Sequence, residues 1–239
     1  EICACLVGSE MCIRDRSTSV CSVALSMDGE VLFAKASFDG PSHAALLGVF
    51  VEEALSVLKK KGKKALDAVA VSSGPGSYTG LRIGVSVAKG LCFGFGIPLI
   101  GIHTLDIMAA TVNSKGDSQI VSMTDNCLYC AMLDARRMEV YAAIYDASLK
   151  PVRETKADIV EVGTYASYLE KGKVCFFGNG ASKCKSVITS PNAIFIEDIH
   201  PLAVNMIPLS EQAFAAGKFE DTAYFEPFYL KEFQATVAK

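Results

Sequence analysis

The order of apolar and polar residues along the chain predicts a mixed α/β protein. Val20 to Leu25 and Glu30 to Ser37 are β-rich runs separated by Met27-Asp-Gly29, a sequence that is typical of a tight hairpin turn. Residues 42–61 are apolar on more than one stripe, which is typical of a helix that is buried on more than one side. The chain is therefore predicted to open with a hairpin and a well-covered helix.

A strand–helix–strand unit follows. Ala68 to Val71 is a short continuous apolar run, as in a strand that is covered on both faces. Beyond a glycine-rich loop, the pattern predicts a helix over residues 78–95, a strand over 98–102 and a helix over 103–112. This spacing predicts a βαβ unit.

The second half of the chain begins near Ser118 and repeats this order, with a hairpin first and helices later. Residues 127–134 and 139–146 predict a strand pair. Further helices are expected over 162–169, 181–188 and 201–217, with a short strand over 174–177. The doubled order predicts two related lobes, an N-terminal lobe over 17–112 and a C-terminal lobe over 113–239.

Residues 1–16 fit neither lobe. Their longest apolar run is Ile2 to Val7, and they lack the basic start and long apolar middle of a secretory signal. The amino-acid sequence from Leu6 to Arg16 resembles the translation of a sequencing-adapter oligonucleotide. We therefore expect a non-native leader in place of a native first strand, and amplification of the native locus tests this expectation.

Composition narrows the class of protein. Apolar residues make up 51% of the chain, enough for a sizeable core, and the net charge is −3. A protein that holds nucleic acid by itself usually carries a basic face, so this balance argues against DNA binding and indicates that any nucleic acid would be held mainly by a partner. No run approaches the roughly 18 apolar residues of a membrane span. The nine cysteines, an odd number scattered through apolar stretches, favour a reducing, cytoplasmic location.

The sequence gives little support to metal or redox chemistry. Cys127 and Cys130 have C-x-x-C spacing, but no second pair matches them, and their apolar, strand-like setting favours two buried thiols. His43, His103 and His200 are not paired at the spacing of a helical metal site. We therefore expect no metal site built from this chain alone.

The strongest local signal is the glycine-rich run from Ser72 to Gly84, in which a strand ends and a helix starts. A helix start can bind phosphate through free N–H groups. The candidate phosphate or nucleotide residues are Gly74, Gly76, Ser77, Thr79 and Gly80, with Ser77 or Thr79 as helix cap. The run is not a P-loop, because Leu81 stands where a P-loop has lysine, and it fits neither the dinucleotide fingerprint nor the nucleophile elbow. A tight turn without a ligand is the simpler interpretation.

The helix after this loop carries small residues at a spacing of four. These residues are Gly80, Gly84, Ala88, Cys92 and Gly96. Glycine inside a helix costs about 1 kcal/mol relative to alanine, so we expect close packing along this row. The packing partner is either the helix of residues 42–61 in the same chain or a helix of another chain, and both readings stay open.

Asp134, Arg136 and Arg137 form a compact charged cluster in an apolar setting. The carboxylate could bind a cation or cap a turn, and the arginines could bind phosphate. A local ion-pair network at a hairpin is the simpler alternative.

Several segments together resemble the TsaB (YeaZ) family. They are Ser17–Leu25, Gly74–Gly84, Ala88–Gly90, Gly96–Pro98, Leu133–Arg137, Glu139–Tyr141 and Pro227–Leu230, in the family's order over about residues 17–231. The resemblance implies an actin-like, sugar-kinase-like (ASKHA, ribonuclease H-like) ATPase fold, with two related lobes of mixed sheets flanked by helices.

The resemblance also implies a role. It suggests a non-catalytic dimerisation and activating subunit that binds the transferase TsaD directly, with TsaE in the same complex. That complex transfers a threonylcarbamoyl group to N6 of adenosine 37 in ANN-decoding tRNAs. No cofactor is expected on this chain alone. ATP or ADP in the complex and a homodimer are left open.

Two departures from related patterns matter. The catalytic relative holds a metal with a His-x-x-x-His motif, whereas here His43 is followed four residues later by Leu47. This argues against both a transferase and a metallopeptidase. In addition, the family's apolar first strand matches residues 13–17 here, where Arg14 and Arg16 would place charge in a central strand.

By the resemblance, the two helices of the first lobe form the partner surface. The candidate interface residues are Leu47, Phe50, Val51 and Ala54 on one helix and Arg82, Gly84, Val85, Ala88, Lys89 and Cys92 on the other. The rival hypothesis is an autonomous small-molecule kinase or ATPase of the same fold. It would need nucleotide loops in both lobes, for which Gly74–Gly80 and Gly178-Asn-Gly180 are candidates, and an acid such as Asp134.

Overall fold

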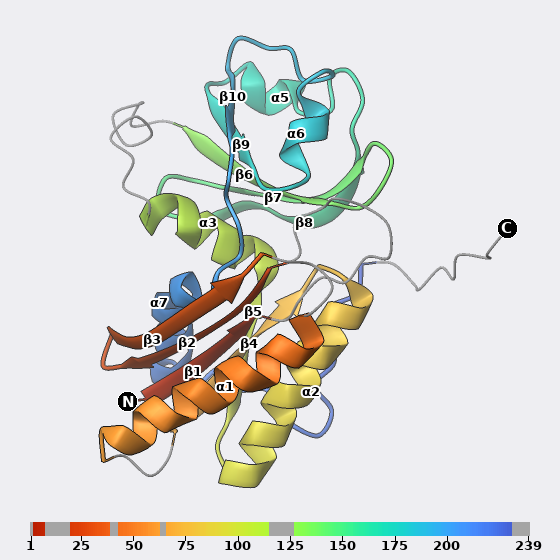
Figure 1. The fold of residues 1–239 in the computed structure, drawn as a ribbon. Helices are drawn as coiled ribbons and strands as arrows, with labels where there is room; N and C mark the ends of the chain where they lie inside the picture. Colours follow the sequence, from red (N-terminus) through yellow and green to blue (C-terminus); the bar gives the residue numbers. More distant parts are fainter. Residues whose placement is uncertain (1, 8–19, 39–42, 63–65, 115–126, 231–239) are drawn as a thin grey trace, which may run out of the picture.

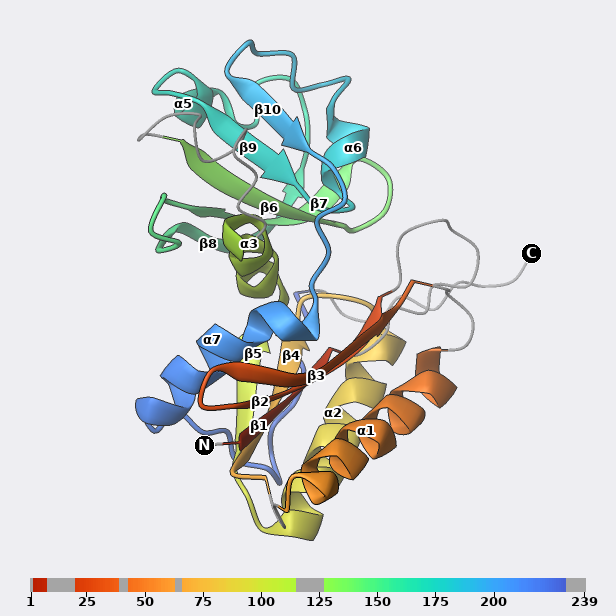
Figure 2. The same cartoon turned by 60° about the vertical axis from the view of Figure 1, so that its left-hand side comes forward.

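The computed structural model shows two lobes, one above the other, with helix α3 (Thr104–Ser114) between them (Figures 1 and 2). The structure describes residues 2–7, 20–38, 43–62, 66–114 and 127–230. Each lobe is built on a five-stranded sheet. No helix in these described ranges is long and apolar enough to cross a membrane.

The first sheet has the order β3-β2-β1-β4-β5. Its strands are β1 (Ile2–Val7), β2 (Cys21–Met27), β3 (Glu30–Ser37), β4 (Ala68–Gly74) and β5 (Leu99–His103). β1, β2 and β3 pair antiparallel, and β4 and β5 continue in parallel from β1. The predicted hairpin and the parallel strand pair are therefore confirmed. Asp28 and Gly29 form the hairpin turn, both with positive φ.

The central strand of this sheet comes from the segment that we expected to be a non-native leader. Ile2–Val7 pairs with β2 on one side and with β4 on the other. Residues 13–17, with Arg14 and Arg16, lie outside the described residues. The non-native origin of residues 1–16 stays a prediction.

The second sheet, read from the other edge, has the order β8-β7-β6-β9-β10. Its strands are β6 (Leu128–Asp134), β7 (Glu139–Tyr145), β8 (Pro151–Ile159), β9 (Val174–Phe177) and β10 (Ala193–Ile196). An antiparallel meander is again followed by two parallel strands. The two sheets share one topology, which confirms two related lobes.

In the described part of the chain, four helices cover the first sheet. On one face lie α1 (His43–Lys60) and α2 (Tyr78–Phe95), and on the other lie α3 and α7 (Ala203–Ala215), as Figure 2 shows. Alternation along the strands divides the core. Cys21, Val23, Leu25, Val69 and Val71 pack with α1 and α2, whereas Ala24, Ala68 and Ala70 pack with α3 and α7.

Much shorter helices cover the outer face of the second sheet. They are α5 (Ala166–Leu169) and α6 (Ala181–Cys184), and both are shorter than predicted. α5 starts late because Gly163 has a φ of +90° and the Thr164 Oγ1 accepts a 2.8 Å hydrogen bond from the Glu161 N–H, which makes a turn instead of a helix. The inner face of this sheet packs on α3.

The chain returns to the first lobe with α7 and stays there. The Glu220 N–H donates to the Leu99 carbonyl at 2.8 Å, and the Phe228 N–H donates to the Ser73 carbonyl at 2.7 Å. α7 and this final segment fall within the expected C-terminal lobe by sequence, but they pack on the first sheet.

Candidate functional site

The glycine-rich loop after β4 is held by the C-terminal segment at one end and by the helix cap of α2 at the other. Gly74 has a φ of +107°, and a Cβ there would lie 2.8 Å from the Phe228 carbonyl oxygen, so the close approach of the C-terminal segment requires glycine. The Ser77 Oγ accepts a hydrogen bond from the Gly80 N–H at 3.4 Å, which confirms Ser77 as the N-cap of α2. Thr79 lies within α2 and is exposed, and Gly80 is buried.

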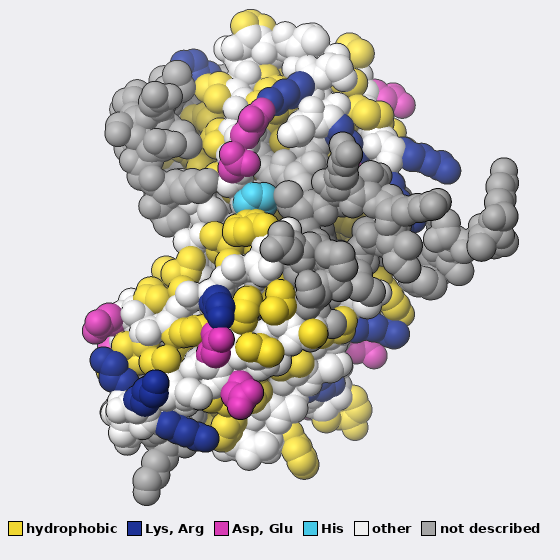
Figure 3. Space-filling model, in the orientation of Figure 1, with side chains coloured by type: hydrophobic (Ala, Val, Ile, Leu, Met, Phe, Trp, Pro, Cys, Tyr) yellow, Lys and Arg dark blue, Asp and Glu magenta, His cyan; other side chains and the backbone are white. Residues whose placement is uncertain are grey.

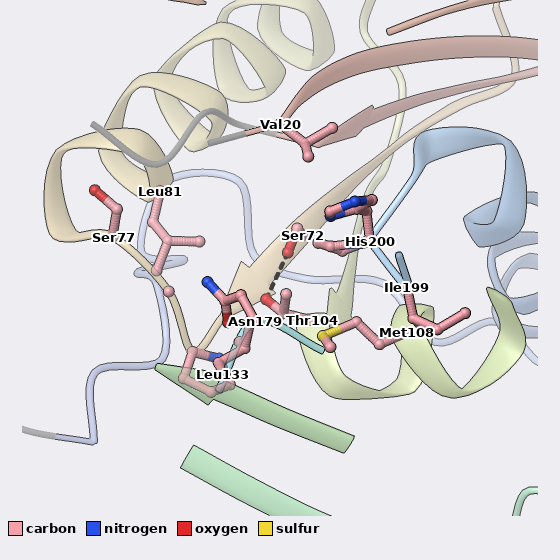
Figure 4. A pocket seen from close by; sticks show the side chains of 13 residues that line it. Val20, Ser72, Ser77, Leu81, Thr104, Met108, Leu133, Asn179, Ile199 and His200 are labelled. Carbon is pink, nitrogen blue, oxygen red and sulfur yellow. Dashed lines mark hydrogen bonds between the residues drawn. The ribbon is translucent and has the colours of Figure 1, made fainter. Parts of the chain in front are cut away.

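A cavity lies between the lobes beside this loop (Figure 4). Its lining residues are Val20, Ser72, Pro75, Gly76, Ser77, Leu81, Thr104, Met108, Leu133, Asn179, Ile199, His200 and Pro201. Apolar side chains from both lobes point into it, and a 2.8 Å hydrogen bond joins the Ser72 and Thr104 hydroxyl groups. Its volume is about 30 Å³, the room of about one water molecule. A nucleotide would fit between these residues only if the lobes moved apart.

The second lobe has a matching loop at the matching place, after β9. Gly178-Asn179-Gly180 corresponds to Gly74-Pro75-Gly76, and Gly178 again has a positive φ, +97°. A Cβ on Gly178 would overlap both the Met108 side chain and the Met132 carbonyl oxygen. The Asn179 Oδ1 accepts a 2.9 Å hydrogen bond from the Asp134 N–H. Other parts of the chain therefore pack closely against the first glycine of each loop.

The charged cluster of the second lobe holds a turn. The Asp134 Oδ1 accepts a 2.8 Å hydrogen bond from the Arg136 N–H and forms an ion pair with Lys183. The Lys183 Nζ also donates to the Glu139 carbonyl at 2.6 Å. Arg136 and Arg137 are exposed, with φ of 70° and 48°. The geometry matches the predicted ion-pair network at a hairpin, but its cation, Lys183, was not predicted.

Most of the predicted interface residues belong to the core of the chain itself. Leu47, Phe50, Ala54, Gly84, Val85, Ala88 and Cys92 are buried. Val51 is partly buried. The Lys89 Nζ donates to the Ala223 carbonyl at 2.9 Å, and Arg82 is exposed, over the Tyr78 ring at 4.4 Å. The buried part of the small-residue row, from Gly80 to Cys92, thus lies on the face of α2 that packs on the sheet.

The opposite sides of α1 and α2 form an exposed surface, here called the outer helix face. It consists of Ala45, Gly48, Val49, Glu52 and Ser56 on α1 and of Thr79, Arg82, Ser86, Gly90, Phe93 and Gly94 on α2. Phe93 is 89% exposed and Val49 is 47% exposed. Around Gly48, Gly90 and Gly94, a Cβ would meet no atom of the described chain within 4 Å. Figure 3 shows hydrophobic side chains spread over this part of the first lobe.

Apart from Arg82, the predicted interface residues did not include these exposed positions, because the prediction followed the most apolar stripe. The signal that could have found them is a second row of small residues, Ser86, Gly90 and Gly94. This row lies one position from Phe93, an aromatic residue outside the buried stripe.

The histidines described in the structure are not grouped into a site. The His103 Nδ1 lies 3.4 Å from the Ser73 Oγ, the His200 ring packs on Phe38, and no group of three potential metal ligands occurs among the described residues.

Sequence comparisons connect the chain to proteins of tRNA modification. The family model described as TsaD, tRNA N6-adenosine threonylcarbamoyltransferase, matches residues 39–238. The tRNA threonylcarbamoyladenosine biosynthesis protein TsaB of Escherichia coli K12 is 30% identical over 241 residues, covering 91% of this chain and 92% of that protein. TsaB of Haemophilus influenzae is 35% identical over 127 residues, covering 53% of this chain and 50% of that protein.

Solved structures show the same fold. YeaZ from Pseudomonas aeruginosa superposes with a TM-score of 0.73 at 24% identity, over 96% of this chain and 99% of that one. A second Pseudomonas aeruginosa structure, of a protein similar to peptidase YeaZ, gives a TM-score of 0.76 at 23% identity with the same coverage. Together with the shared topology of the two lobes, these likenesses confirm the expected fold.

Proposed function

Because this chain belongs to the TsaB (YeaZ) family of tRNA threonylcarbamoyladenosine biosynthesis proteins, we propose that it is the non-catalytic, activating subunit of the complex that modifies adenosine 37. In this role it binds TsaD directly, and TsaE and tRNA join through the complex. The complex transfers the threonylcarbamoyl group to N6 of the adenosine in ANN-decoding tRNAs.

The outer helix face is the observation that carries this proposal. Gly48, Gly90 and Gly94 each cost the helix about 1 kcal/mol relative to alanine, yet none of them has a neighbour in the described chain that would require glycine. Glycines at a spacing of four let another helix approach closely. Phe93 beside them exposes a large apolar side chain, which is typical of a contact surface. Such a surface gains stability when a second protein covers it.

Two observations support the non-catalytic part of the proposal: the residue at a metal-ligand position and the size of the interlobe cavity. Leu47, which replaces the second histidine of the catalytic relative's motif, is 1% exposed and packs in the core. The interlobe cavity of about 30 Å³ is far below the roughly 300–1,000 Å³ of small-molecule sites. These features favour a subunit that acts through contact over an autonomous kinase.

Reconstitution tests the proposal. Cognate TsaD, TsaE and the adenylate-forming enzyme are incubated with an ANN-decoding tRNA, with and without this chain, and threonylcarbamoyladenosine is measured. We expect modification only when the chain is added, and no ATP turnover by the chain alone. Equal modification without the chain, or robust ATP turnover by it alone, would refute the proposal and favour the autonomous enzyme.

Direct binding is measured separately. In size-exclusion chromatography, we expect the chain and TsaD to elute as a complex with one copy of this chain. A homodimer of this chain should not bind TsaD, because both assemblies would use the outer helix face. A ternary species with two copies of this chain and one TsaD would contradict that shared surface.

A further inference from the structure

A pair of thiols meets at the amino-terminal ends of β6 and β9. Cys127 stands immediately before β6, and Cys175 is the second residue of the neighbouring parallel strand β9. Their Sγ atoms are 2.9 Å apart, and both residues are 3% exposed. A disulfide has an S–S distance of about 2.05 Å, so the sulfurs would need to approach by about 0.9 Å. Cys127 lies outside the strand, where the backbone can adjust.

Only one of these two cysteines lines a cavity. The cavity has a volume of about 430 Å³, within the usual range of small-molecule sites. Its lining residues are Cys127, Leu128, Asp146, Ala147, Ser148, Tyr168, Lys171, Gly172 and Lys173. Cys175 is not among them. An external reagent that enters the cavity therefore meets Cys127 first.

Charge in this cavity favours an anionic reagent. Lys171 and Lys173 both line it. The opposing carboxylate, Asp146, is engaged within its own loop, where its Oδ1 accepts hydrogen bonds from the Ser148 N–H at 2.8 Å and the Lys150 N–H at 3.0 Å.

The two thiols also differ in acidity. The hydrogen bond from Cys175 lowers the pKa of Cys127 against the opposing effect of burial, and the positive charge of Lys173 adds to the lowering. The same hydrogen bond and burial raise the pKa of Cys175. By contrast, burial alone raises the pKa of Cys21 to about 11. Cys127 is thus the better nucleophile at neutral pH.

We propose that Cys127 and Cys175 form a reversible disulfide by exchange with a small anionic disulfide that binds in this cavity. The Cys127 thiolate attacks one sulfur of the reagent RSSR, which forms a mixed disulfide and releases RS⁻. The Cys175 thiolate then attacks the Cys127 sulfur, displaces the second RS⁻ and closes the intrachain bond. Two protein thiols are oxidised and RSSR is reduced to two RSH, which take up the two thiol protons. This inference is independent of the proposed tRNA function.

One experiment tests the order of attack. The full chain is treated with oxidised glutathione, its remaining thiols are blocked with an alkylating agent, and its disulfides are mapped by mass spectrometry. The wild type is expected to give a peptide pair linked through Cys127 and Cys175. Cys175→Ser should stop at the mixed disulfide on Cys127, at a level about tenfold above any mixed disulfide on Cys175 in Cys127→Ser. No linked pair in the wild type, or the reverse order of labelling, overturns the proposal. If a variant fails to fold, the wild-type map still decides whether the Cys127–Cys175 disulfide forms.

Two controls sharpen this test. Cys130→Ala removes a buried thiol that packs on the other face of the same sheet, and it should leave the linked pair unchanged. Cystamine, a disulfide with two amines, replaces oxidised glutathione in a parallel reaction. We expect it to react several-fold more slowly, because Lys171 and Lys173 repel it. Equal rates would overturn the assignment of an anionic reagent.

Discussion

The two lobes share a strand order but differ in their helices. In the first lobe, the helices that follow β3 and β4 are α1 and α2, with 18 residues each. In the second lobe, the helices at the same two places are α5 and α6, with four residues each. Both pairs cover one face of a five-stranded sheet.

Short helices are sufficient to cover such a face. The outer core of the second lobe is filled by large side chains, including Tyr165 and Phe176, which are fully buried. The longer helices α1 and α2 bury one side along most of their length and expose the other side. The outer helix face lies on the side of these helices that the core does not use, and the proposed contact with a partner gives a reason other than folding for the glycines that weaken the helices. On the proposed function, the first lobe is the contact lobe.

The largest effect expected is the loss of the second lobe's core. Phe176→Ala removes a fully buried ring, so the free energy of unfolding should fall by about 3–5 kcal/mol. Hydrogen exchange measured by mass spectrometry should show loss of protection in β6 and β9, with α1 largely protected. Equal loss of protection in α1 would show that the lobes unfold as one unit and would break the comparison between them.

A second comparison uses the two matching glycines. Gly178→Ala should lower the free energy of unfolding by about 3 kcal/mol, from backbone strain and overpacking against Met132. Gly74→Ala should cost less, about 2 kcal/mol, because a Cβ there would lie 2.8 Å from its nearest neighbour, the Phe228 carbonyl oxygen, whereas a Cβ on Gly178 would lie even closer to the Met108 side chain. Urea unfolding of both variants checks this order. A larger cost at Gly74 would mean that the C-terminal segment is the more rigid neighbour.

The sequence predicts most of the fold because its hydrophobic periods are clear. Both hairpins, the βαβ unit and α2 over 78–95 occur as predicted. β8 was missed because Pro151–Ile159 is an edge strand with mostly exposed side chains and no apolar alternation. Only the tertiary structure shows that α7 leaves the second lobe and packs on the first sheet, since nothing local records which sheet a helix covers.

The candidate sites were less predictable. An apolar helix identifies which residues are buried, but it does not show whether a sheet of the same chain or a partner covers them. Leu47 and Ala88 were expected at an interface and instead lie in the core. The thiol pair was hidden for a related reason. The C-x-x-C spacing pointed from Cys127 to Cys130, which lie on opposite faces of the sheet, whereas Cys175 comes close only through the pairing of β6 and β9.

The next prediction tests the contact lobe directly. Gly90→Leu places a bulky side chain in open space, so the chain should stay folded, but the side chain should hold a partner helix away. We expect threonylcarbamoyladenosine formation in the reconstituted system to fall at least about tenfold, equivalent to about 1.4 kcal/mol of binding free energy. The matched control is Ser167→Leu, an added leucine on the exposed side of α5 in the other lobe. Full activity of both variants would show that the outer helix face is not the contact surface.

The smallest effect has the opposite sign. Gly48→Ala on α1 meets no neighbour within 4 Å, so it should raise the free energy of unfolding by about 0.5–1 kcal/mol through helix propensity. Gly163→Ala in the second lobe is the matched control. It also has open space, but its φ of +90° should make alanine destabilising by about 1 kcal/mol. Urea unfolding measures both signs, and titration with TsaD measures the cost to binding. A Gly48→Ala variant that is more stable and binds TsaD as tightly as the wild type would show that Gly48 does not contact TsaD. The proposed partner surface would then be confined to α2.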